Sequence, residues 1–176
     1  RSAVGGALQF EAVPSEVTDL ESVTGAYPID VDSDGVVDLV VLRNGANVVL
    51  RGLGECRFEP ATERLGIDGG DDWTTAFSAT WEGDNSLPTL AFGTYLEDDW
   101  TTCGDSSLVR PDGDTYGPPF ALTPGYCTLS MLFSDWNRAG QRDLRLANDR
   151  HYYTDGSEQL WAMPPGEDPS LYTDAD

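Results

Sequence analysis

Carboxylates recur at every second position in "DVDSDGVVDLVVL", residues 30–42. Charges of like sign that are crowded into one short loop repel one another, and a bound cation would relieve this repulsion. Ca²⁺ is the hard cation that takes about six to eight oxygen ligands in a flexible loop, and Gly35 permits the sharp turn that such a loop needs. The stretch therefore predicts a calcium site. Its predicted ligands are Asp30, Asp32, Asp34, the backbone carbonyl of Val36, and Asp38.

The acidic loop has two other interpretations, a solvated turn and an EF-hand. Asp and Gly are common in turns, so the stretch is also compatible with a solvated acidic turn. An EF-hand is excluded because its twelfth loop position needs a bidentate Glu, and Val41 stands there. The residues that follow, "DLVVLRNGANVVLRG", form two runs rich in Val and Leu around Asn44-Gly45, which predicts a hairpin with a two-residue turn. The loop is therefore expected to lead into strands and not into a helix.

A weaker version of the loop occurs in "SDWNRAGQRDLRLAND", residues 134–149. Alignment of Asp38 with Asp143 gives an offset of 143 minus 38, or 105 residues, and places Ala139 where the first loop has Asp34. The predicted ligands of a weaker second metal site are Asp135, Asn137, the backbone carbonyl of Gln141, and Asp143.

Halfway between the two loops, "WEGDNSLPTLAFG" has Thr89-Leu90 in the Asp-Leu place and has lost most of the acids. The spacing predicts one segment of three units, residues 10–66, 67–120 and 121–176. A unit of about fifty residues is typical of a propeller blade of four strands. Little helical periodicity is present, and 19 Gly and 11 Pro separate short runs that favour strands. We therefore expect an all-β protein with four-stranded antiparallel sheets and no helix longer than two turns.

Composition limits the partners and the compartment. The chain has 31 Asp and Glu against 10 Lys and Arg, a net charge of −21, which argues against binding to nucleic acid or to anionic membranes. No apolar run is long enough to span a membrane. Cys103 and Cys127 both lie in turn-rich sequence, and we expect a disulfide between them in an oxidising compartment. Cys56 is then either buried and free or paired outside this chain.

The sequence carries no pattern that indicates catalysis. It has no G-x-S-x-G elbow and no phosphate-binding Gly-Lys loop, and its one histidine, His151, has no cysteine near it. Paired carboxylates are abundant, but in so acidic a chain they carry little information about glycoside cleavage. The five tryptophans could line a carbohydrate face, although packing inside the sheets accounts for most of them, Trp136 and Trp161 in particular.

Residues 30–39 resemble the calcium loop of FG-GAP or VCBS-type repeats, which in integrin α-subunits and related secreted proteins form β-propellers, usually with about seven blades. The segments "NVVLRGLGECRFEPATERLGI", "FSDWNRAGQRDLRLANDRHYY" and "EQLWAMPPGE" resemble repeats of cartilage-acidic-protein-like, ASPIC/UnbV-associated proteins. The resemblance runs from Gln9 to Tyr172. It implies a secreted, extracellular or periplasmic propeller that binds calcium.

Three blades are too few to close a propeller, so we expect contact with the remaining blades of the same polypeptide or with another copy. The expected function is non-catalytic, in adhesion, recognition of a protein or glycan, or scaffolding. The alternative is an accessory or carbohydrate-binding module of a secreted enzyme.

Overall fold

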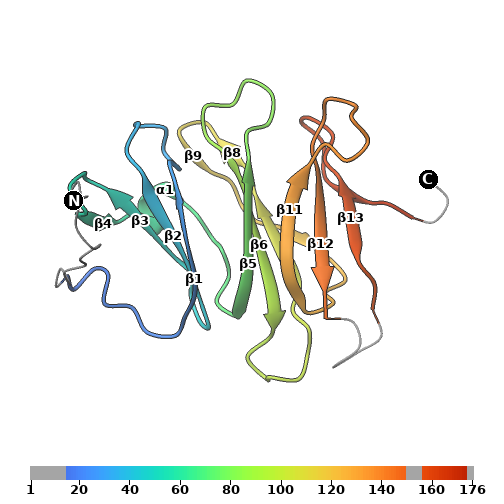
Figure 1. Ribbon diagram of the computed structural model, residues 1–176, viewed down its shortest axis with the longest axis horizontal. Coiled ribbons are helices and arrows are strands. Elements are labelled where there is room, and N and C mark those ends of the chain that lie inside the picture. The colour runs from blue at the N-terminus through green and yellow to red at the C-terminus, as the bar shows by residue number, and fades with distance from the viewer. Residues whose placement is uncertain (1–14, 150–155, 174–176) are drawn as a thin grey trace, which may run out of the picture.

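The computed structural model describes residues 15–149 and 156–173, which form three four-stranded antiparallel sheets that follow one another along the chain (Figure 1). Sheet 1 contains β1 (Val23–Ile29), β2 (Asp38–Arg43), β3 (Val48–Gly52) and β4 (Phe58–Pro60). Sheet 2 contains β5 (Trp73–Thr80), β6 (Thr89–Leu96), β7 (Ser106–Val109) and β10 (Phe120–Leu122). Sheet 3 contains β11 (Thr128–Ser134), β12 (Asp143–Asn148), β13 (Gln159–Ala162) and β14 (Ser170–Leu171). The predictions of an all-β fold and of four-stranded antiparallel sheets are confirmed.

Two short insertions interrupt this pattern. Helix α1 (Thr62–Leu65) follows sheet 1, and it is the only helix within the ranges that the structure describes. The hairpin of β8 (Pro111–Asp112) and β9 (Thr115–Tyr116) lies between β7 and β10, so sheet 2 is completed only after this excursion. The predicted boundary between the second and third units, at residue 120, falls inside β10.

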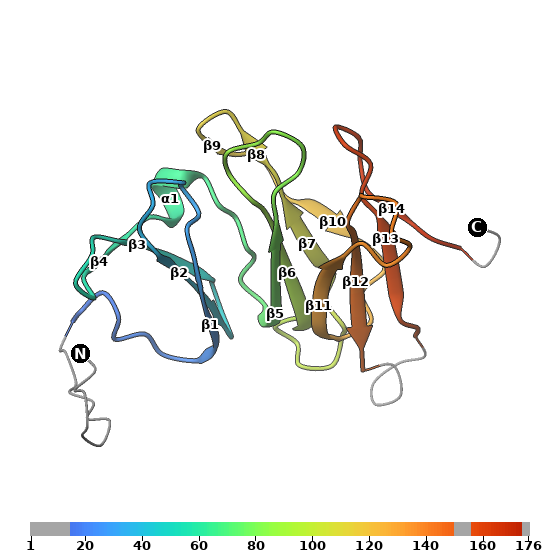
Figure 2. The same cartoon turned by 45° about the horizontal axis from the view of Figure 1, so that its top comes forward.

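The sheets stack face to face on two hydrophobic cores. In β6, Leu90 and Phe92 pack in the core shared with sheet 1, whereas Ala91 packs in the core shared with sheet 3. Because side chains alternate between the two faces of a strand, a sheet covered on both faces needs apolar residues at successive positions. This explains the uninterrupted "LAF" of β6. Strand β5 contacts both β1 and β11, so the first strands of the three sheets lie next to one another (Figures 1 and 2).

The connection between β2 and β3 differs from the prediction. Strand β2 ends at Arg43 and β3 begins at Val48, with Val41 opposite Val48, so the predicted two-residue turn at Asn44-Gly45 is wrong. The side chain of Asn47 is the reason: its Oδ1 accepts the Arg43 backbone N–H at 2.8 Å, and its Nδ2 donates to the carbonyl of Gly69. The amide thus joins a wider turn to the start of sheet 2.

The predicted disulfide is present between Cys103 and Cys127, with a Cα–Cα distance of 4.5 Å. It joins the loop after β6 to the residue before β11, and so connects sheet 2 with sheet 3. Cys56 is a free thiol at an exposed position, which rules out the expectation that it is buried.

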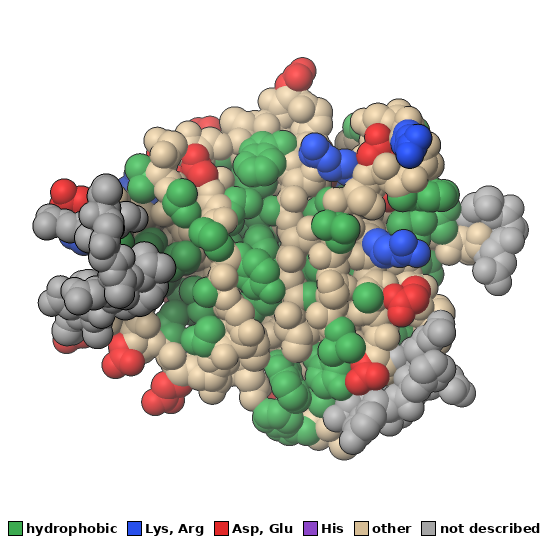
Figure 3. Space-filling model, in the orientation of Figure 1, with side chains coloured by type: hydrophobic (Ala, Val, Ile, Leu, Met, Phe, Trp, Pro, Cys, Tyr) green, Lys and Arg blue, Asp and Glu red, His purple; other side chains and the backbone are tan. Residues whose placement is uncertain are grey.

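The surface seen in Figure 3 carries hydrophobic side chains near its centre and acidic side chains scattered over it. Leu129 and Leu132 on β11 are 52 % and 60 % exposed, and Leu132 lies on the face opposite to the buried Met131 and Phe133. This outer face of sheet 3 is therefore partly apolar. In the described ranges, no helix is long and apolar enough to cross a membrane.

Candidate metal centre

The acidic loop connects β1 to β2, at the same end of the molecule as the loops that connect β5 to β6 and β11 to β12 (Figures 1 and 2). The strand pairing places Asp38, Thr89 and Asp143 in equivalent positions. Each begins the second strand of its sheet, opposite the last residue of the first strand. The three connections, residues 30–37, 81–88 and 135–142, can therefore be compared directly.

Asp38 lies at the bottom of the first loop and has no exposed surface. Its Oδ2 accepts the Val31 N–H and its Oδ1 accepts the Gly52 N–H, both at 2.8 Å. A Cβ atom at Gly52 would meet the carbonyl oxygen of Val37 at 2.2 Å, so only glycine lets the loop lie this close to β3. Burial raises the pKa of Asp38, although the two N–H donors act in the opposite direction, and the charges of Asp32 and Asp30 raise it further.

Asp30 and Asp32 converge with Asp38, and each of the three offers a carboxylate oxygen within 4.8 Å of those of the others. Asp30 also shapes the turn, because its two oxygens accept the N–H groups of Asp34 and Gly35 at 3.2 and 2.9 Å. Gly35 adopts a φ of +83°, the left-handed conformation that favours glycine.

The Oδ1 atom of Asp32 is buried and has no hydrogen-bond partner among the described residues. Its other oxygen, Oδ2, accepts the Arg51 Nε at 2.9 Å and an Arg64 nitrogen at 3.3 Å. A buried carboxylate oxygen without a donor is costly, so an ion at this point would satisfy it.

The remaining two predicted ligands lie differently. Asp34 is not part of the convergent group: its Oδ1 accepts the Val36 N–H at 2.8 Å, and its Oδ2 pairs with Nη2 of Arg51. Val36 is half-buried next to this turn, and a Cβ at Gly52 would lie 3.0 Å from its side chain. The structure thus brings together three of the four predicted carboxylates and turns the fourth toward an arginine.

Two residues from other elements close the loop, and no pattern in the sequence indicated them. Arg51 lies at the end of β3, and its guanidinium reaches Asp32, Asp34 and Glu59. Tyr116 of β9 is buried, and its hydroxyl donates to the Val31 carbonyl at 3.0 Å. Burial, followed by the charges of the acidic loop, raises the pKa of Tyr116. The arginine in "VVLRG" was visible in the sequence, but its target was not.

The loop between β5 and β6 has a different set of partners. The Thr89 hydroxyl donates to Oε1 of Glu82 at 2.6 Å, and the Arg110 guanidinium contacts both Glu82 oxygens at 3.0 and 3.1 Å. The one carboxylate that faces Thr89 is thus paired with an arginine. This loop also touches the first loop, because the Ser33 hydroxyl donates to the Ser86 carbonyl.

In the third loop, protein donors surround the residue equivalent to Asp38. Asp143 is buried and accepts Nε1–H of Trp136 at 2.7 Å, the Tyr172 hydroxyl at 3.1 Å and the Met163 N–H at 3.3 Å.

The other predicted ligands of the third loop make local bonds. Asp135 Oδ2 accepts the Gly140 N–H at 3.0 Å, and Asn137 Oδ1 accepts the Ala139 N–H at 2.9 Å. The side chain of Gln141 donates to the Met163 carbonyl. Asp135 and Asn137 are exposed on the turn, whereas Asp143 lies in the interior with its own donors.

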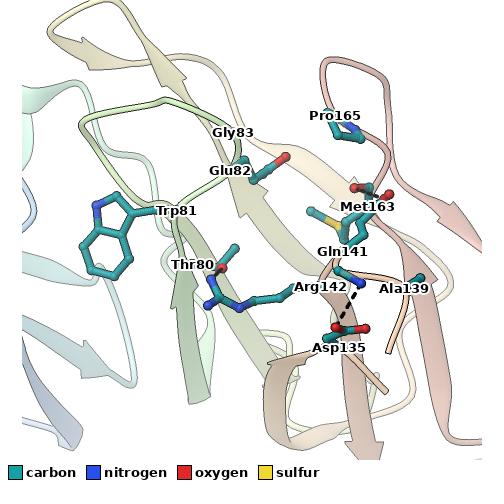
Figure 4. Close-up of a pocket in the computed structure, with 11 residues that line it drawn as sticks. Thr80, Trp81, Glu82, Gly83, Asp135, Ala139, Gln141, Arg142, Met163 and Pro165 are labelled. Atoms are coloured by element: carbon teal, nitrogen blue, oxygen red, sulfur yellow. Dashed lines mark hydrogen bonds between the residues drawn. The ribbon is translucent and has the colours of Figure 1, made fainter. Parts of the chain in front are cut away.

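A cavity of about 650 Å³ opens between the second and third loops (Figure 4). Arg142 crosses it and donates to the Thr80 hydroxyl at 3.0 Å, and Met163 and Pro165 form its other side. Trp81 belongs to the rim, but its indole points away from the cavity in Figure 4 and donates to the Ser86 carbonyl.

The tryptophans only partly follow the expectation of burial. Trp161 is buried, but Trp81, Trp100 and Trp136 are about half exposed, so the prediction that packing accounts for Trp136 is wrong. The Trp136 side chain lies on the surface and donates its indole N–H to the buried Asp143 at 2.7 Å. The rings of Trp73 and Trp100 are in contact, with centroids 5.4 Å apart, and both residues lie in the pentapeptide "DDWTT", which occurs at residues 71–75 and 98–102. His151 lies outside the described residues.

Asp30, Asp32 and Asp38 together form an all-oxygen group, the donor type that hard cations such as Ca²⁺ and Mg²⁺ prefer. No model of a known protein family matches this chain, and a search of curated proteins finds none that is similar to it.

Proposed function

We propose that this chain is a non-catalytic, calcium-binding β-propeller segment that acts outside the cytoplasm in adhesion, recognition or scaffolding. The observation that carries the proposal is the convergence of Asp30, Asp32 and Asp38, with the buried Asp32 Oδ1 unpartnered among the described residues. The loop supplies oxygen ligands only, and the resemblance of residues 30–39 to the FG-GAP calcium loop favours Ca²⁺ over other hard cations.

The arrangement of the sheets supports the propeller. Three four-stranded antiparallel sheets stack through separate cores, and β5 contacts both β1 and β11, as adjacent blades do around an axis. Closure would need further blades, from the same polypeptide or from another copy. The exposed Leu132 on the outer face of sheet 3, with the exposed Leu129 on the same strand, is suited to such a contact. The disulfide is compatible with a secreted or periplasmic protein.

A carbohydrate-binding module of a secreted enzyme is the second candidate, and the cavity beside Arg142 is the observation that favours it. A cavity of this volume is in the range of small-molecule sites. Sugar rings usually stack on an aromatic face, however, and the Trp81 indole is directed away from the cavity. A glycan array with the wild-type chain and an Arg142→Ala variant tests this candidate.

The calcium proposal is tested by isothermal titration of the chain with CaCl₂ after removal of metal by chelation. Asp30→Asn should lose most of the binding, because it removes one of the three convergent charges. Asp135→Asn is the matched control. Asp135 accepts the Gly140 N–H in the third loop, in the same way that Asp30 accepts the Gly35 N–H in the first loop. Absence of binding to the wild-type chain at millimolar calcium, or equal loss in both variants, would contradict the proposal.

A further inference from the structure

An arginine occupies the same place in sheets 1 and 2. Leu50 of β3 lies opposite Leu39, and Val109 of β7 lies opposite Leu90, the residues that follow Asp38 and Thr89. Arg51 and Arg110 come directly after Leu50 and Val109. Both guanidinium groups therefore reach the loop that enters the second strand. In sheet 3 the residue opposite Leu144 is Trp161, and Ala162 follows it.

The loop of sheet 2 shows what this arginine does when the loop has little negative charge. Arg110 makes two hydrogen bonds to Glu82, which also accepts the Thr89 hydroxyl. One guanidinium and one carboxylate cancel there, with side-chain exposures of 26 % and 14 %. In this loop the arginine is the cation that neutralises the acid.

The loop of sheet 1 has the same arginine but more acid. Asp30, Asp32, Asp34 and Asp38 carry four negative charges, of which Arg51 cancels one. Arg64 adds a longer contact to Asp32 from an exposed position. Arg51 uses Nε for Asp32 and Nη2 for Asp34, so one guanidinium engages two of the four carboxylates predicted to bind the ion.

We propose that Arg51 is a built-in cation that competes with calcium for Asp32 and Asp34 and so lowers the affinity of the site. This inference rests on the proposed function. Asp34 lies outside the convergent group, with its Oδ2 on Arg51, so it can join an ion there only by turning away from the arginine. Asp32 can bind through its free Oδ1 while Oδ2 stays on Arg51, but the ion then lies close to a positive charge.

The expected size of the effect follows from this repulsion. A unit charge about 6 Å from a divalent ion in a water-like dielectric changes the binding constant about tenfold. The loop would then keep its shape through Arg51 at low calcium and bind the ion only where calcium is abundant. Arg51, on β3, thus sets the calcium concentration at which the carboxylates between β1 and β2 bind the ion.

The opposite role for Arg51 is also testable. If the guanidinium mainly holds Asp32 so that Oδ1 faces Asp30 and Asp38, its removal would weaken calcium binding. Competition and positioning therefore predict changes in calcium affinity of opposite sign when the Arg51 guanidinium is removed.

The experiment is calcium titration calorimetry of the wild-type chain, Arg51→Gln and Arg110→Gln. Glutamine keeps hydrogen-bonding groups and removes the charge. We expect Kd for calcium to fall at least about tenfold in Arg51→Gln and to stay within about twofold of wild type in Arg110→Gln, the matched control in sheet 2. Arg51→Lys, which keeps the charge but loses the two-pronged pairing, serves if Arg51→Gln does not fold, and should bind calcium more tightly than wild type.

The outcomes separate the inference from the proposed function. If the wild-type chain binds calcium and Arg51→Gln binds it equally or more weakly, the competition by Arg51 is overturned, whereas the proposed calcium site is not. Binding in Arg51→Gln but not in the wild-type chain confirms the competition and overturns calcium binding by the native chain. Absence of binding in all folded variants overturns both.

Discussion

Asp38 should stabilise the fold even without calcium, because its carboxylate accepts hydrogen bonds from two buried backbone donors. Replacement by Ala leaves the N–H groups of Val31 and Gly52 unpaired, each now bonded at 2.8 Å. An unsatisfied buried donor costs about 1–3 kcal/mol, and two cost about 2–6 kcal/mol. Part of this cost is offset, because the substitution also removes the buried carboxylate of Asp38, whose pKa is raised by burial. We expect Asp38→Ala to lower the free energy of unfolding by about 2–4 kcal/mol.

The assay is urea unfolding followed by tryptophan fluorescence, with chelator present so that metal does not contribute. For a chain of this size 1 kcal/mol shifts Tm by about 2–4 °C, so thermal unfolding by circular dichroism should show a fall of roughly 5–15 °C. Asp34→Ala is the control. Its carboxylate is exposed and pairs with Arg51, which predicts a loss below about 1 kcal/mol. If Asp38→Ala stays within about 0.5 kcal/mol of wild type in chelator, the two hydrogen bonds do not hold the loop and the reasoning is refuted.

Two further predictions concern residues outside the loop. Tyr116→Phe removes the hydroxyl that donates to the Val31 carbonyl and should cost about 0.5–1.5 kcal/mol in urea unfolding; an unchanged midpoint would show that this buried bond contributes nothing. Asp99 accepts the Thr102 hydroxyl and the Thr101 and Thr102 N–H groups, which lower its pKa to about 2 from 3.8. The stabilisation by ionised Asp99 is therefore present above pH 3.8 and is lost as the pH falls toward about 2. Between these pH values the Tm of Asp99→Ala should fall less than the Tm of the wild-type chain. Parallel plots of Tm against pH for the two proteins would contradict this prediction.

Local sequence was sufficient wherever the interaction is between neighbours in the chain. Short runs rich in Val and Leu, separated by Gly and Pro, predicted strands, since these runs combine strand-favouring residues with turn residues at their ends. The spacing of Asp30, Asp32 and Asp38 predicted a cluster, because a turn at Gly35 returns the chain on itself within a few residues. Cys103 and Cys127 were paired correctly from the turns around them. The strands and the acidic cluster need only the geometry of a short segment, whereas the disulfide joins residues 24 positions apart.

Tertiary structure decided which groups complete each loop. Asp34 has the right spacing for a ligand, yet it pairs with Arg51, which comes from a different strand and whose reach depends on sheet register. Asp143 looks like Asp38 in sequence, but Trp136 and Tyr172 supply donors that the first loop lacks. These partners lie up to 29 residues away along the chain. Spacing within a loop determines where its own carboxylates can point, whereas the packing of strands determines which cation or donor meets them.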